Sequence, residues 1–199
     1  MDSSILTTEN FGDYTGKTKG NHWDFTRFNP KHFQHIENCI HRLGELGIEA
    51  DLIMMHPYDR WGFSQMTKEQ DDLYWNYAVA RFSAFANVWW SLANEYDLMP
   101  HKAIQDWERY ASILCEKDPY HHMRSIHNCV SLYDFSRPWI THCSVQRTDL
   151  YKSSEITNEL RERYHKPVVL DEIAYEGDIQ HGWGNLTGEE MLRRFWEAA

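Results

Sequence analysis

The sequence contains no apolar stretch longer than a strand, which excludes the roughly 20-residue span that a transmembrane helix needs. Its first residues, Met1 to Ser4, lack the basic and apolar regions of a signal peptide, so a cytoplasmic location is the default expectation. Basic residues are also scarce, because 20 Lys and Arg stand against 30 Asp and Glu, for a net charge of -10. Nucleic acids and anionic membranes are therefore not expected as partners.

Motifs for metals, disulfides and phosphates are missing as well. The four cysteines are far apart and form no C-x-x-C pair, which is typical of reduced, packed thiols. The 12 histidines form no H-E-x-x-H motif, and the sequence has neither a glycine-rich phosphate loop nor a G-x-S-x-G elbow. We therefore expect no cofactor and no metal, although histidines from separate strands could still build a metallohydrolase site.

A regular alternation of helix and strand signals is what the sequence does contain. Capping patterns and three- and four-residue apolar spacing predict helices, and short apolar runs between them predict strands. The pattern amounts to five strands and six helical segments. The strands are expected at residues 48–55, 87–93, 123–126, 139–143 and 168–172, and the clearest helices at about 30–46, 67–85, 104–114, 154–164 and 187–199.

Repeated β-then-α units predict a parallel sheet, and polar residues at strand ends are typical of the α/β (β/α)8 TIM barrel. Such a barrel needs about 250 residues. The 199 residues are therefore expected to form a single, incomplete catalytic barrel domain over residues 1–199, short by about three strands. Exposed strand edges of an incomplete barrel could cause self-association. The alternative is a complete five-stranded doubly wound sheet.

Two of the predicted strands end in carboxylates. Asn94-Glu95 follow the second strand, and Asp171-Glu172 end the fifth. Glycoside hydrolysis needs one acid to protonate the leaving oxygen and one carboxylate to attack or stabilise the sugar, so we expect Glu95 and Glu172 to be the catalytic pair. Asp171 and Glu176 compete for the second role. In an extended strand Asp171 and Glu172 point oppositely, so at most one of them would face the barrel interior.

Further polar and aromatic residues follow the strand ends and would share one rim of a barrel. We expect these residues to bind the substrate. The predicted substrate-binding residues are His56, Asp59, Arg60, Trp61, Asn94, His127, His142, Gln146, Tyr175, Glu176 and Trp183. Trp61 and Trp183 could stack on sugar rings, and Asn94 could hydrogen-bond the 2-hydroxyl of the sugar.

Several of these segments resemble a known family. The run Trp-Ser-Leu-Ala-Asn-Glu at 90–95 is similar to the strand-four signature of clan A retaining glycoside hydrolases, and Asp171-Glu172 matches the place of their strand-seven nucleophile. More closely, the segments at 56–61 and 171–177 resemble the apiosidase-like barrel family of bacterial glycoside hydrolases. The resemblance implies a (β/α)8 barrel of which this chain carries strands three to seven, with Glu95 as acid/base, Glu172 as nucleophile, and retention of configuration.

Together these patterns predict a retaining glycoside hydrolase that acts on plant-type or other complex oligosaccharides. The alternative from another class is a non-catalytic carbohydrate-binding barrel, or an inactive fragment of such a hydrolase. A binding-only protein would keep its sugar affinity, without turnover, when both glutamates are changed to glutamine.

Overall fold

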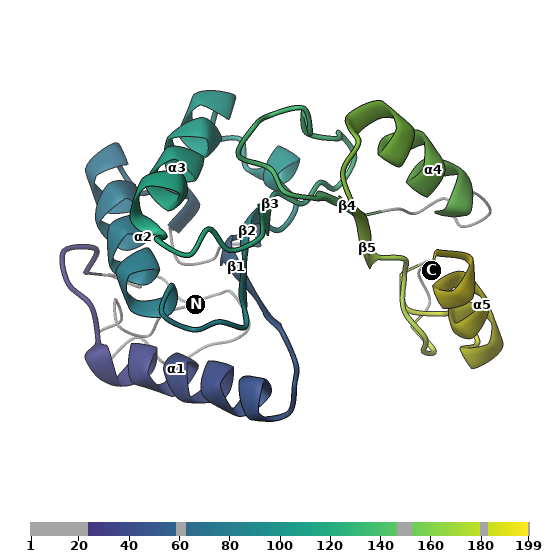
Figure 1. Ribbon diagram of the computed structural model, residues 1–199, viewed down its shortest axis with the longest axis horizontal. Coiled ribbons are helices and arrows are strands. Elements are labelled where there is room, and N and C mark those ends of the chain that lie inside the picture. The colour runs from purple at the N-terminus through teal and green to yellow at the C-terminus, as the bar shows by residue number, and fades with distance from the viewer. Residues whose placement is uncertain (1–23, 59–62, 147–152, 180–182, 199) are drawn as a thin grey trace.

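The computed structural model describes residues 24–58, 63–146, 153–179 and 183–198. The predicted substrate-binding residues Asp59, Arg60 and Trp61 lie outside these ranges. Helices and strands alternate along the chain (Figure 1), in the order α1 (Pro30–Glu45), β1 (Ala50–Met55), η3 (Phe63–Gln65), α2 (Lys68–Phe82), β2 (Val88–Ala93), η4 (Tyr96–Leu98), α3 (Ile104–Lys117), β3 (Arg124–Ser125), β4 (Cys143–Gln146), α4 (Ser153–Tyr164), β5 (Val168–Glu172) and α5 (Gly188–Ala198).

Local signals explain where the first helices begin and end. Asn29 caps α1 by accepting a hydrogen bond from the Lys31 amide, and Pro30 occupies its first turn, where a missing N–H costs nothing. Gly47, with φ of 71°, follows the helix in the left-handed conformation that glycine adopts readily. A capping box between Thr67 and Gln70 opens α2 as the sequence predicts.

The prediction for the fourth strand was displaced. The strand was expected at 139–143, but β4 covers Cys143–Gln146. Trp139 and Ile140 are instead buried in the turn before it, where the Ile140 amide donates to the Arg137 carbonyl. The indole of Trp139 donates to Glu108 and packs near Tyr133. Their apolar character therefore reflects loop packing rather than a strand.

All strand pairs in the described ranges are parallel. One sheet has the order β1-β2-β3 and the other the order β4-β5. Hydrogen bonds from the Thr141 amide to the Arg124 carbonyl and from the Ser125 hydroxyl to the His142 carbonyl connect the two sheets. Because the strands follow in sequence without the switch point of a doubly wound sheet, the arrangement is that of a barrel wall.

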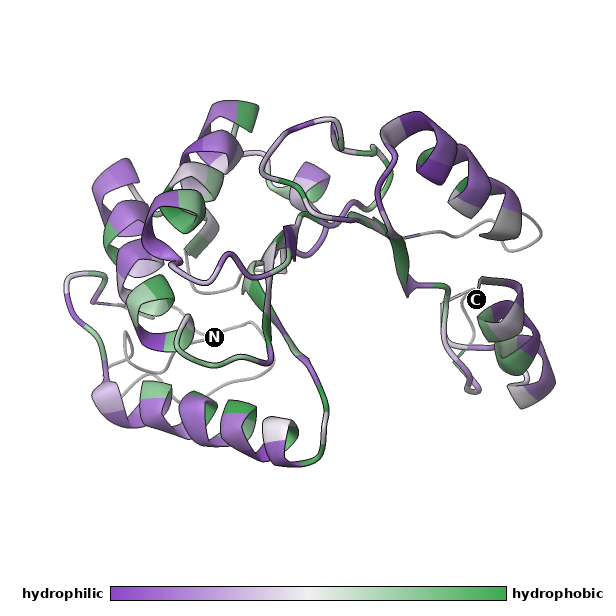
Figure 2. Cartoon of the chain, in the orientation of Figure 1, coloured by the Kyte–Doolittle hydropathy of each residue, from purple (hydrophilic) through white to green (hydrophobic). Residues whose placement is uncertain are grey.

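The helices cover the outer side of this wall. In Figure 1, α1, α2 and α3 lie beside β1–β3, whereas α4 lies beside β5 and contacts α5. Large aromatic side chains from helices and strands, such as Trp75, Trp90 and Trp107, are completely buried between them. Figure 2 shows mixed faces on α1, α3 and α5 and a mostly hydrophilic α4. No helix in the described ranges is long and apolar enough to cross a membrane.

Candidate active site

Strand β2 ends in a turn that presents Glu95. The Asn94 amide donates to the Met55 carbonyl of β1, and the amides of Glu95 and Tyr96 donate to His127, to its Nδ1 at 3.2 Å and its carbonyl at 3.0 Å. Glu95 itself has φ of 48°, a left-handed conformation that costs a residue with a Cβ about 1–2 kcal/mol. The bonds to His127 and β1 hold the turn in this shape.

Glu95 is only 4% exposed, and three donors surround its carboxylate. The Tyr58 hydroxyl and the side-chain amide of Asn94 both donate to Oε2 of Glu95, the latter at 3.3 Å. Burial and a hydrogen bond to Glu95 raise the pKa of the Cys129 thiol to about 11. Burial and the same carboxylate also raise the pKa of Tyr58, so the phenol and the thiol both keep the protons that they donate.

A β-bulge shapes the end of β5. Its register with β4 runs Val145 to Leu170 and then Gln146 to Glu172, so Asp171 is an extra residue. In a regular strand, neighbouring side chains point to opposite sides of the sheet, and a bulge can turn two of them to the same side. Asp171 and Glu172 consequently line the same pocket. The expectation that at most one of them would face the interior is wrong, because it assumed a regular strand.

The surroundings of Glu172 are more open than those of Glu95. Its side chain is 20% exposed, and the Tyr175 hydroxyl donates to Oε2 at 2.5 Å. Burial and this hydrogen bond raise the pKa of Tyr175 to about 12. Oε1 of Glu172 lies 3.8 Å from Nε2 of His127. One imidazole therefore contacts the backbone of one candidate glutamate and faces the carboxylate of the other.

Asp171 has a different chemical character from its neighbour. Burial raises its pKa to about 7, and repulsion from Asp51 and Glu172 adds to the shift, against a hydrogen bond from the Ser144 hydroxyl. An acid that titrates near neutrality is protonated much of the time, which makes it a poor nucleophile. Asp171 therefore competes weakly with Glu172 for that role.

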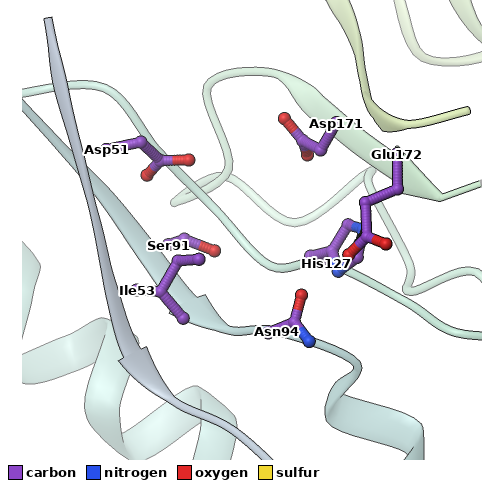
Figure 3. A pocket seen from close by; sticks show the side chains of 7 residues that line it. All are labelled: Asp51, Ile53, Ser91, Asn94, His127, Asp171 and Glu172. Carbon is purple, nitrogen blue, oxygen red and sulfur yellow. Dashed lines mark ion pairs between the residues drawn. The ribbon is translucent and has the colours of Figure 1, made fainter. Parts of the chain in front are cut away.

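These side chains gather around a cavity of about 250 Å³, whose lining residues are drawn in Figure 3. In Figure 3, Glu172 extends toward His127, Asn94 lies beside them, and Asp51 and Ser91 border the other side. Its lining residues are Asp51, Ile53, Ser91, Asn94, His127, Asp171 and Glu172. A concave site with several converging polar groups is what binding of a polyhydroxylated ligand requires.

The other predicted residues divide into two groups. Trp183 lies beside the site, with its ring 6.0 Å from that of Tyr175, and the ring of His56 lies 6.3 Å from that of Tyr58. His142 and Gln146 are buried and do not line the cavity.

Glu176 also lies off the cavity. Its carboxylate is next to Gly188 at the start of α5, where a negative charge is favoured. Glu176, the competitor that the sequence could not distinguish from Glu172, therefore does not line the cavity that Glu172 lines.

Sequence reasoning missed several residues of the site. Tyr58 and Cys129 contact Glu95, while Asp51, Ser91 and Ser144 belong to the inner face of the strands. Tyr58 could have been found, because it lies two residues after His56 at the end of β1. Within the described residues, no group of three or more His, Cys, Asp or Glu side chains could hold a metal ion.

Solved structures similar to this chain are glycoside hydrolases. A putative glycoside hydrolase from Bacteroides vulgatus is 40% identical, with a TM-score of 0.88 over 98% of this chain and 39% of its own. A family 5 glycoside hydrolase from the same organism is 17% identical, with a TM-score of 0.65 over 96% of this chain and 44% of its own. The β-D-glucuronidase of Dictyoglomus thermophilum is 18% identical, with a TM-score of 0.51 over 81% and 33%.

At 17% and 18% identity, the last two matches show only a shared fold, which is the parallel α/β fold of TIM-barrel type. This chain spans 39% of the length of the Bacteroides vulgatus relative that shares 40% identity. No curated protein matches it. The apiosidase-like catalytic domain matches residues 3–198, nearly the whole sequence. The chain therefore belongs to the apiosidase-like family, a family of glycosidases, as its strand-end motifs predicted.

Proposed function

We propose that this chain carries the catalytic centre of a retaining glycoside hydrolase, with Glu95 as acid/base and Glu172 as nucleophile. The observation that supports this proposal most is their shared contact with His127, which accepts a hydrogen bond from the Glu95 amide at 3.2 Å and lies 3.8 Å from the Glu172 carboxylate. Two acids brought together from separate strands are the equipment that this reaction needs.

Each glutamate would act in both steps. In the first, Glu95 protonates the leaving oxygen while Glu172 attacks the anomeric carbon and forms a glycosyl-enzyme. In the second, Glu95 takes a proton from water, which displaces Glu172 and releases the sugar with its configuration retained. Tyr58 donates a hydrogen bond to Glu95 and Tyr175 donates one to Glu172, and these bonds would keep the two carboxylates oriented between the steps.

The proposed substrate is a plant-type or other complex oligosaccharide. The cavity at the ends of β1, β2 and β5 would receive one sugar, and Trp183 beside Tyr175 could stack on it. We further infer that residues 1–199 form a single, incomplete barrel domain with strands three to seven. A cytoplasmic location and self-association of an incomplete barrel remain predictions from the sequence.

An aryl glycoside panel tests the assignment. Glu172→Gly should reduce hydrolysis about 10²- to 10⁴-fold or more, and added azide should restore turnover as a glycosyl azide. Glu95→Gln should slow substrates with poor leaving groups far more than activated ones, because only the former need its proton. The exposed Glu159→Gln on α4 is the matched control.

Two results would count against this function. Full activity of Glu172→Gly without azide adducts would remove the nucleophile from the proposal. Sugar binding that survives Glu95→Gln and Glu172→Gln together, in a chain that turns over no glycoside, would support the carbohydrate-binding alternative.

A further inference from the structure

His127 is the most buried polar side chain that lines the cavity. It follows β3, is 3% exposed, and has its backbone fixed by bonds from its amide to the Ala93 carbonyl and from the Tyr96 amide to its own carbonyl. Its ring nitrogens then have separate environments. Nδ1 accepts the hydrogen bond from the Glu95 amide, so a neutral ring carries its proton on Nε2.

This Nε2 lies near the second glutamate. Nε2 is buried and has no hydrogen-bond partner among the described residues, and the nearest acid is Glu172, with Oε1 at 3.8 Å. This separation is longer than a hydrogen bond. A buried donor without a partner costs free energy, so a shift of the Glu172 side chain toward the ring is favourable.

We propose that His127 is a positioning residue whose neutral, Nε2-protonated ring fixes the backbone of Glu95 and orients the carboxylate of Glu172. The assignment of these two glutamates as catalytic rests on the function proposed above. The positioning role rests on the observed bond to the Glu95 amide. A protonated ring would carry N–H on both nitrogens and could no longer accept this bond, which would release the left-handed turn at Glu95.

The charged groups around the ring come from two directions. Glu95 and Asp97 follow β2, and Glu172 ends β5. All three favour the protonated ring, but burial outweighs them and lowers the pKa of His127 below its usual value. The nearby thiol of Cys129 stays protonated and adds no charge. The ring is therefore neutral at neutral pH and charges only on acidification.

Nitrogen-15 NMR of the full chain tests the tautomer without any substrate. We expect the His127 signals of a neutral ring with its proton on Nε2 at pH 7, and a titration below the usual histidine range that moves the Glu95 amide signal with it. A proton on Nδ1, or a charged ring at pH 7, would overturn the proposal. These signals do not depend on hydrolysis, so a failure here is separate from a failure of the proposed function.

Two variants separate the two contacts of the ring. His127→Asn keeps an acceptor near the position of Nδ1, whereas His127→Gln keeps a polar group only near Nε2. We expect the Glu95 amide signal to survive in the first and to shift strongly in the second. His127→Gln should also lower kcat on the order of 10²-fold, with a smaller change in KM, because it misplaces the acid/base.

His122→Asn is the matched control, because His122 lies at the opposite end of β3 and bonds Asp118 at 2.9 Å. It should lower the melting temperature but leave the acidic limb of the pH profile and the Glu95 signal unchanged. Equal effects of all three variants on stability, with one common pH profile, would show that His127 is merely structural.

Discussion

The two sheets each supply one candidate catalytic glutamate but support it differently. Beneath Glu95, the β1–β2–β3 sheet is packed against three helices through completely buried aromatic residues, including Trp75 and Trp90. Glu172 ends a strand whose apolar residues Val168 and Leu170 pack against the core but are only partly buried. Glu95 is thus held by core packing, whereas Glu172 depends on a bulge and a few hydrogen bonds.

The helices repeat this contrast. Helix α3 buries four residues of its inner face, while the described part of α5 buries only Arg194, whose guanidinium donates to the Ile173 carbonyl at 2.6 Å. Leu192, Phe195 and Trp196 of α5 are largely exposed, at the three- and four-residue spacing of one helix face. Stability of the chain should therefore come mainly from the half that holds Glu95.

Replacing one tryptophan in each half gives the largest expected difference. Trp107 is 1% exposed in α3, and Trp107→Ala should cost about 3–5 kcal/mol through lost burial and a cavity. Trp196 is 68% exposed, and Trp196→Ala should change stability by no more than about 0.5 kcal/mol. Urea unfolding measures both. Comparable losses would break the contrast and would mean that the exposed face of α5 is covered in solution, for example by self-association.

Acid should weaken the junction between the sheets. His142 is 4% exposed there, with its ring 5.4 Å from Trp89, and burial lowers its pKa to about 4. The folded protein therefore binds this proton less readily than the unfolded chain, so stability is retained above about pH 6.5 and lost as pH falls toward 4, by on the order of 3 kcal/mol.

His142→Asn should remove this part of the acid sensitivity in urea unfolding at pH 4 and pH 7. His101→Asn, on an exposed turn, serves as the control. An unchanged pH dependence in His142→Asn would mean that the two sheets separate, or admit water, before the histidine titrates.

The smallest expected effect on stability concerns Asp171 in β5, and here stability should fall as pH rises. Because the folded state raises the pKa of Asp171 to about 7, it holds this proton longer than the unfolded chain does, and stability falls as pH rises from about 4 to 7. Asp171→Asn should therefore be more stable than the parent at pH 8 and equal to it at pH 4. The residue is open to water on one side, which reduces the gain.

Thermal melts at the two pH values check this prediction, with Ser144→Ala as a companion. That change removes the hydrogen bond that favours ionised Asp171 and should raise its pKa further. A lower melting temperature of Asp171→Asn at pH 8 would show that the charged carboxylate is stabilising, contrary to its raised pKa.

Elements with strong local signals could be predicted from the sequence. The caps at Asn29 and Thr67 and the run before Asn94 depend on neighbouring residues alone, and the helices and β2 appear where those signals place them. The strand expected at 139–143 was misplaced because the apolar side chain of Trp139 packs near Tyr133 in a loop and does not belong to a strand. Burial by distant residues leaves no periodic signal.

In the candidate site, too, the sequence predicted residues with a local signal but not the contacts between distant segments. Glu95 and Glu172 are visible as carboxylates after apolar runs, but their surroundings depend on contacts between distant segments. The thiol of Cys129 reaches Glu95 from another strand end, and Ser144 reaches Asp171 across the sheet. The bulge that brings Asp171 and Glu172 to one side is a mismatch between two strands, and neither strand's sequence shows it alone.

Under the acid/base role proposed for Glu95, its left-handed backbone places stability and activity in opposition. Glycine would adopt φ of 48° without the steric cost that a side chain brings. Selection for a more stable turn would therefore favour the loss of the carboxylate, and selection for proton transfer would oppose it. This turn is a point where a screen for thermostable variants would enrich proteins that have lost Glu95.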